Sequence, residues 1–191
     1  MSETARGPGV SADELRRAFD LGFATMPVDG GESAEPFLAL TMGKDAYAVR
    51  VREIAGFAAA RKIVALASPI PEMLGLAGLR GTLVAVYSLA RLFGYEDSDP
   101  RLRWFILCAG PEPLALAFAE FHGYLEVPRS DLRPASERET DHGHVREVLR
   151  AGDIARGVIG VASLIRAIEK KVAAAGGANR PSPAVLGRVD T

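Results

Sequence analysis

The sequence predicts a mainly β fold, a barrel or sandwich of short strands, with one helix near the carboxyl end. Between residues 36 and 161, short apolar runs alternate with turns rich in Gly, Pro and Asp, and no long helical pattern separates them. After residue 163 the apolar side chains recur with a helical period instead. A βαβ sheet would require helices between the strands, so this succession argues against one.

The composition is that of a balanced globular protein. Of 191 residues, 48% are hydrophobic, and 23 basic against 24 acidic residues give a formal net charge of -1. No long block of one sign occurs, so nucleic acid and anionic membrane are disfavoured as partners. Cys108 is the only cysteine, which excludes an internal disulfide and fits a reducing compartment. Because no secretory signal or membrane span is evident, we expect a soluble cytoplasmic protein without direct membrane insertion.

Residues 1–35 are interpreted as an amino-terminal extension. Ser11 and Glu14 have the spacing of a capping box, and apolar side chains recur at every fourth position from Leu15 to Phe23. This pattern predicts a short amphipathic helix, and the Gly-, Pro- and acid-rich stretch after it is typical of a linker.

Strands are expected next. Residues 37–51 predict a hairpin whose turn lies at residues 43–45, and residues 62–71 are interpreted as a further strand. Residues 82–88 form a strand pattern that is apolar on both faces, so both faces should be covered by protein. The glycines before it suit a tight turn.

The second half of the chain continues the pattern. Strands are predicted at residues 104–110 and 114–127, each apolar and separated by a Gly-Pro turn, and residues 128–147 are interpreted as a long polar loop. A last strand around residues 157–161 leads into the terminal helix.

The terminal helix is expected to start at Ser163, a plausible N-cap, and to bury Leu164, Ile165 and Ile168. Lys170 and Lys171 would then lie near its carboxyl end, where the helix dipole favours cations. Residues 173–191 are interpreted as a disordered tail, because two glycines and two prolines follow the helical pattern.

Sequence motifs for catalysis are missing. The chain has no phosphate-binding loop, dinucleotide-binding glycines, nucleophile elbow or paired-cysteine metal site. Asp141, His142 and His144 could contribute to a metal site, but their polar, loop-like context is more typical of solvated side chains. His122 is interpreted as a strand histidine rather than a base. We therefore expect a binding protein without cofactor or metal.

Arg80 is the one charge in the apolar stretch from Gly75 to Gly94. Gly78 and Gly81 flank its turn. From residue chemistry alone, a solvated turn arginine is the commoner interpretation, and a functional charge held at the mouth of the strand is the alternative.

Four segments in order resemble the CheW family of chemotaxis adaptors over roughly residues 36–172. They are FLALTMGKDAYAVRV, PEMLGLAGLRGTLVAVYSLARLFG, FHGYLEVPRSDLRP and GVIGVASLIRAIEKK. The strongest part, LGLAGLRGTLVAVYSL, is similar to the Asn-Leu-Arg-Gly motif and apolar strand of that family.

The resemblance implies two intertwined five-stranded SH3-like β-barrels with a C-terminal helix, and an apolar groove between the barrels. It implies a non-enzymatic adaptor that couples the cytoplasmic tip of methyl-accepting chemoreceptors to the regulatory domain of a CheA-type histidine kinase. Ile54, Gly75 and Arg80 match positions of the receptor-binding groove, where Gly75 would admit a partner closely and Arg80 would supply a charge.

The sequence also departs from the family pattern. Gly78 stands in place of asparagine, Ala85 of proline, Ser88 of aspartate and Gly56 of glutamate. These changes leave open a divergent member that binds receptors without coupling the kinase. A small β-barrel that binds nucleic acid is a further alternative, which the balanced charge and the 7% aromatic content disfavour.

Overall fold

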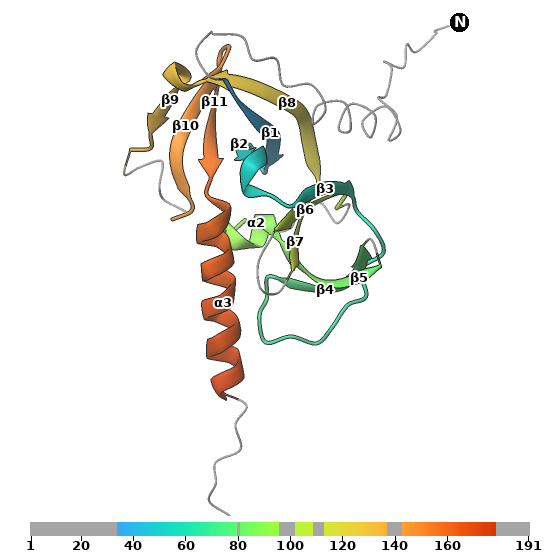
Figure 1. Ribbon diagram of the computed structural model, residues 1–191. Coiled ribbons are helices and arrows are strands. Elements are labelled where there is room, and N and C mark those ends of the chain that lie inside the picture. The colour runs from blue at the N-terminus through green and yellow to red at the C-terminus, as the bar shows by residue number, and fades with distance from the viewer. Residues whose placement is uncertain (1–33, 80, 96–101, 109–112, 137–142, 179–191) are drawn as a thin grey trace, which may run out of the picture. The chain divides into compact units, whose positions relative to one another are not determined.

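The computed structural model describes residues 34–79, 81–95, 102–108, 113–136 and 143–178 (Figure 1). The chain divides into two units, Met1–Ser33 and Ala34–Thr191, and the description below concerns the second. The predicted helix between Ser11 and Phe23 lies outside the described residues.

The predicted fold class is confirmed: the second unit is mainly β, with two sheets and a carboxyl-terminal helix. The first sheet has six strands rather than five, because residues 132–134 add a short edge strand. In spatial order they are β8 (Glu120–Pro128), β1 (Ala34–Met42), β2 (Asp45–Arg50), β11 (Ile154–Ile159), β10 (Val145–Ala151) and β9 (Leu132–Pro134).

The second sheet has five strands. In spatial order they are β3 (Gly56–Ala59), β6 (Trp104–Cys108), β7 (Leu114–Phe118), β5 (Thr82–Ser88) and β4 (Met73–Leu79). Along the chain, β1 and β2 of the first sheet come first, all five strands of the second sheet follow, and the remaining strands of the first sheet come last (Figure 1). Each sheet consequently contains one parallel pair, β2 with β11 and β5 with β7.

The first hairpin forms where it was predicted. β1 and β2 pair antiparallel from Phe37–Arg50 to Met42–Asp45. Gly43 has a φ of 62° in the turn, a value that favours glycine.

Strand β5 is covered on both faces over its carboxyl-terminal half, as its sequence predicted. Val84 and Val86 pack in a cluster formed by the second sheet, whereas Tyr87 packs in the main cluster on the other side. Leu83, near the start of the strand, remains 64% exposed.

Three predictions of extended structure or loop were wrong in part. Residues 62–71 form no strand and contribute only a single bridge, from Val64 to Leu76. Two prolines in this segment lack the N–H that a ladder needs. Residues 114–127 form two strands, β7 and β8, which separate at Ala119 and join different sheets. The predicted loop 128–147 contains η2 (Arg129–Asp131), β9 and the start of β10.

Helix α3 (Val161–Ala178) starts two residues before the predicted N-cap, Ser163. The Ser163 hydroxyl donates to the Gly160 carbonyl (2.8 Å) and so does not cap the helix. Leu164 and Ile168 are buried as predicted, and Ile165 is partly buried. Lys171 lies in the body of the helix rather than at its end, and it pairs with Glu72.

One main hydrophobic cluster joins the two sheets and α3. It contains side chains from both sheets and from the helix, among them Leu38, Leu40, Ile106, Leu116 and Leu164. Cys108 belongs to the same cluster and is 2% exposed. Burial raises the pKa of its thiol to about 12.

Candidate protein-interaction site

Ile54 follows the short helix η1 (Val51–Glu53), which turns the chain from β2 toward β3. Its backbone N–H donates to the Val51 carbonyl (3.3 Å). The Ile54 side chain is partly buried and packs against the main cluster. The predicted groove residue is therefore held at the border of the core rather than on a free loop.

Gly75 lies in β4 with a φ of 139°. A Cβ on this residue would come within 2.1 Å of the Val64 carbonyl oxygen. Val64 and Leu76 exchange both backbone hydrogen bonds, at 2.8 and 2.9 Å, so this chain's own segment 60–71 lies directly on β4. The close approach expected at Gly75 is thus made by Val64, not left open for a partner.

Exposed apolar side chains gather beside this contact. Val64 is 60% exposed, Leu66 46% and Leu83 64%. Val64 pairs with Leu76, and Leu83 pairs with Gly78 two residues further along β4, so the Val64 and Leu83 side chains emerge on the same face. We call Val64, Leu66 and Leu83 the exposed apolar surface. Such surfaces mark contacts with other proteins when they are contiguous.

Arg80 lies outside the described residues. Its neighbour Leu79 is the last residue of β4, and Gly81, just before β5, has a φ of 79°. Leu83, a member of the exposed apolar surface, pairs with Gly78 close to the end of β4.

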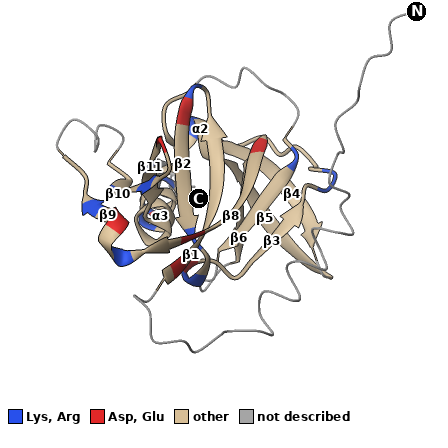
Figure 2. Cartoon of the chain, turned by 90° about the horizontal axis from the view of Figure 1, so that it is seen from above, with Lys and Arg blue, Asp and Glu red and all other residues tan. Residues whose placement is uncertain are grey.

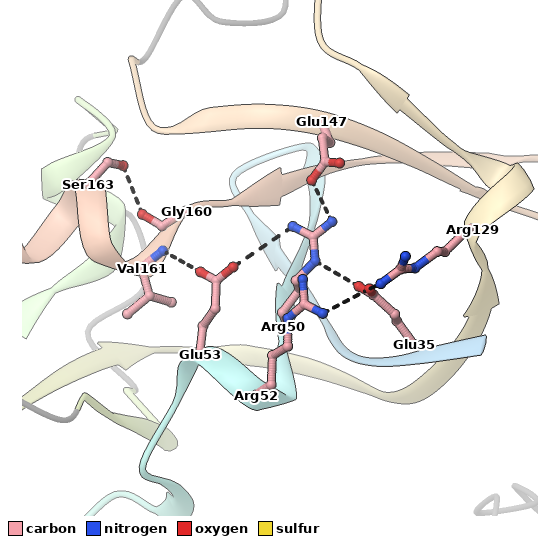
Figure 3. Close-up of polar contacts among 9 residues, drawn as sticks. All are labelled: Glu35, Arg50, Arg52, Glu53, Arg129, Glu147, Gly160, Val161 and Ser163. Atoms are coloured by element: carbon pink, nitrogen blue, oxygen red, sulfur yellow. Dashed lines mark hydrogen bonds and ion pairs between the residues drawn. The ribbon is translucent and has the colours of Figure 1, made fainter. Parts of the chain in front are cut away.

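Glu53, the last residue of η1, contacts the start of α3. The Val161 backbone N–H donates to Glu53 Oε2 (3.1 Å), and Glu53 Oε1 lies 3.9 Å from the Arg50 guanidinium (Figure 3). A carboxylate in this place satisfies a free backbone donor and complements the positive end of the helix dipole. Sequence reasoning missed it, because 108 positions separate the two residues.

Arg50 is the buried centre of a polar cluster (Figure 3). It donates from Nε to Glu35 (2.9 Å) and from a terminal nitrogen to Glu147 (2.5 Å). Arg52 and Arg129 also bind Glu35. The hydrogen bond from Arg50 is the main cause that holds the pKa of Glu35 below its usual value, despite the opposing effect of burial. This cluster joins β1, β2 and β10 near Ile54.

The histidines of the described part make local contacts. His122 Nε2 lies 2.7 Å from the Thr41 hydroxyl on the neighbouring strand, and His144 packs beside Phe93 and contacts Ser163. Asp141 and His142 lie outside the described residues. Within the part that the structure describes, no group of three or more His, Cys, Asp or Glu side chains could hold a metal ion.

Charges are interspersed along the described strands rather than gathered in a patch of one sign (Figure 2). No helix in the described ranges is long and apolar enough to cross a membrane.

Two sheets around a shared core, with exposed apolar side chains beside one hairpin turn, fit the class of small β-rich protein-interaction modules. The chain belongs to the CheW family, since the family model described as a CheW-like domain matches residues 36–168. The structure is similar to that of the scaffolding protein TtCheW from Thermoanaerobacter tengcongensis, with a TM-score of 0.60 and 15% identity. That match covers 66% of this chain and 89% of the other, and it shows a shared fold. No curated protein matches the sequence.

The structure also shows the surroundings of two residues that depart from the family pattern, Ser88 and Gly78. Ser88, in place of aspartate, is fully buried and accepts a hydrogen bond from the Arg91 N–H (3.3 Å) as the N-cap of α2 (Leu89–Leu92). Aspartate and serine are both good N-caps, so this role survives the change. Gly78, in place of asparagine, is exposed, and a side chain there would meet nothing within 4 Å.

Proposed function

We propose that this chain is a non-enzymatic adaptor that couples the cytoplasmic tip of methyl-accepting chemoreceptors to the regulatory domain of a CheA-type histidine kinase. Membership of the CheW-like family and a fold shared with a protein described as a scaffold support this role. The adaptor would act in the cytoplasm and be recruited there to receptor arrays.

The exposed apolar surface is the observation that carries the proposal. Val64 is 60% and Leu83 64% exposed, and both pair with residues of β4. A helical partner binds such a surface through apolar anchors spaced along one side of the helix. Truncating central apolar anchors removes a large share of the binding energy at protein interfaces.

Among the predicted site residues, Ile54 and Arg80 remain proposed receptor contacts. Ile54 borders the core at the end of η1, and Arg80 is proposed from its place in the sequence between Leu79 and Gly81. Gly75 takes an indirect part: it lets segment 60–71 lie on β4 and thereby positions Val64.

The test compares two exposed apolar residues of similar size. We expect Leu83→Asp to weaken binding of a receptor-tip fragment by about tenfold or more, because it puts a charge into an apolar contact. Ile154, 49% exposed at the turn between β10 and β11 in the other sheet, gives the control variant Ile154→Asp. Titration by calorimetry measures both affinities, and melting curves verify folding.

The outcomes separate the proposed roles. Binding of both the receptor fragment and the kinase regulatory domain supports the adaptor. Binding of the receptor alone supports a receptor-only member, the alternative raised by the departures at Gly56, Ala85 and Ser88. Binding of neither overturns the proposal. Equal losses of receptor affinity in Leu83→Asp and Ile154→Asp would show that the exposed apolar surface is not the receptor-binding site.

A further inference from the structure

The six-stranded sheet has an inner face with its own hydrophobic cluster. We call this the inner-face cluster; it consists of Phe37, Ala48, Val127, Leu149 and Val158. Side chains alternate between the two faces of a strand, so every second residue of β2 and β11 points to this face. Two arginines occupy such positions, Arg50 in β2 and Arg156 in β11.

Arg50 is fully compensated. Its guanidinium lies 5.3 Å from the centre of the Phe37 ring and binds Glu35 and Glu147, with Glu53 nearby. Aromatic contact and paired carboxylates are what a buried guanidinium requires, because it keeps its charge at every physiological pH. Arg50 therefore shows how this sheet accommodates a buried cation.

Arg156 is buried to the same degree, but the described residues supply no such carboxylate or ring to it. It is 9% exposed, against 8% for Arg50. It is two residues from Val158 and pairs with Leu149, which places it on the inner face. Its Nε is buried and donates to no acceptor among the described residues. No carboxylate of the described residues forms an ion pair with Arg156.

The acids around Arg50 bind that residue and not Arg156. In the parallel pairing of β2 and β11, Gly157 lies opposite Tyr47, so Arg156 is level with Ala46. Four residues of extended chain, about 13 Å, separate that level from Arg50. The neighbouring positions on this face include Ala46, Ala48 and Ala151, whose side chains offer no hydrogen-bond acceptor. Glu147 also lies on this face, opposite Val158, and its carboxylate binds Arg50 (2.5 Å).

We propose that Arg156 binds a small dissolved oxyanion, of the phosphate or carboxylate type, on the inner face of the six-stranded sheet. The planar guanidinium donates two parallel hydrogen bonds to such an ion, which supplies the charge that Glu35 and Glu147 supply to Arg50. Only 9% of Arg156 is exposed, so the access suits an ion rather than a side chain on a folded partner. This site is independent of the exposed apolar surface.

The test replaces chloride by phosphate, and in a second series by acetate, at constant ionic strength. We expect the melting temperature to rise by about 3 to 5 °C once the oxyanion is tenfold above its dissociation constant. The Nε–H signal of Arg156 in NMR spectra should shift and saturate over the same range. If both phosphate and acetate raise the melting temperature, the site binds oxyanions as a class. If only phosphate raises it, the site is specific for phosphate.

Two variants assign the effect to the site. Arg156→Leu should abolish both the melting shift and the ion dependence, since an apolar side chain beside Leu149 is compatible with the inner-face cluster. Arg150→Leu, at an exposed position of β10, should keep the shift. A melting shift that persists in Arg156→Leu overturns the proposal. An Nε–H signal of Arg156 that does not respond to the oxyanion in the unmodified protein also overturns it. If Arg156→Leu does not fold, the NMR measurement alone decides.

Discussion

Gly75 and Gly78 lie three residues apart in β4, yet a side chain would affect them very differently. Gly75 combines a φ of 139° with a Cβ position only 2.1 Å from the Val64 oxygen, whereas nothing lies within 4 Å of a Cβ at Gly78. We expect Gly75→Ala to lower the free energy of unfolding by about 2 to 4 kcal/mol and Gly78→Ala to change it by less than about 0.5 kcal/mol. Urea unfolding of both variants measures the difference. Equal values would mean that segment 60–71 does not lie on β4.

Glu35 should make stability depend on acidity. Its pKa in the folded protein is held below the ordinary value of 4.5, chiefly by the hydrogen bond from Arg50. The stabilisation is therefore complete above the unfolded pKa and is lost as the pH falls through the lowered folded pKa. We expect Glu35→Gln to cost about 1 to 3 kcal/mol at neutral pH, because the neutral amide loses charge-assisted hydrogen bonds.

The difference between Glu35→Gln and the unmodified protein should then shrink as the pH falls below 4.5. Urea unfolding at a series of pH values measures it. Glu126→Gln, at an exposed position of β8, serves as the control and should show little difference at any pH. A cost of Glu35→Gln that stays constant into strong acid would contradict the assignment.

At the scale of elements, α3 depends on a cap from a distant part of the chain. Glu53 accepts the hydrogen bond of the Val161 N–H, so the end of η1 fixes the start of the helix. We expect Glu53→Ala to lower stability by about 1 kcal/mol and to speed amide exchange in the first turn of α3. Glu169→Ala, at an exposed position in the body of the helix, should leave that exchange unchanged. Equal protection in both variants would exclude the cap.

Local patterns predicted those elements whose cause is local. The β1–β2 hairpin follows from alternation and from Gly43, and the apolar β5 follows from its two covered faces. The separation of β7 from β8 at Ala119 has no comparable signal, because both strands are apolar and only the sheet that each joins distinguishes them. The start of α3 was predicted at Ser163 for the same reason: the sequence shows a good capping residue but not Glu53.

At the scale of the whole molecule, the candidate site was only partly predictable. The sequence indicated Ile54 and the β4–β5 turn, but it could not show that Val64 covers Gly75 or that Leu83 stays exposed. Those facts depend on how segment 60–71 runs across the second sheet. The buried cluster around Arg50 likewise joins residues from three separate strands, and their pairing follows from the fold rather than from spacing.

The main cluster leads us to expect that both sheets unfold together. Leu38 comes from the first sheet, Leu116 from the second and Leu164 from α3, and each is at most 1% exposed within one cluster. We expect Leu116→Ala to lower the free energy of unfolding by about 2 to 5 kcal/mol, whereas Val172→Ala, at an exposed helix position, should have little effect.

Because the core is shared, amide protection in β1 of the first sheet should fall together with amide protection in β7 of the second sheet in Leu116→Ala. Hydrogen exchange measures both strands, and fluorescence of Trp104 in the second sheet should follow the same unfolding transition as circular dichroism of the whole chain. Protection lost in β7 but retained in β1, or two separate transitions, would show that each sheet is stable by itself.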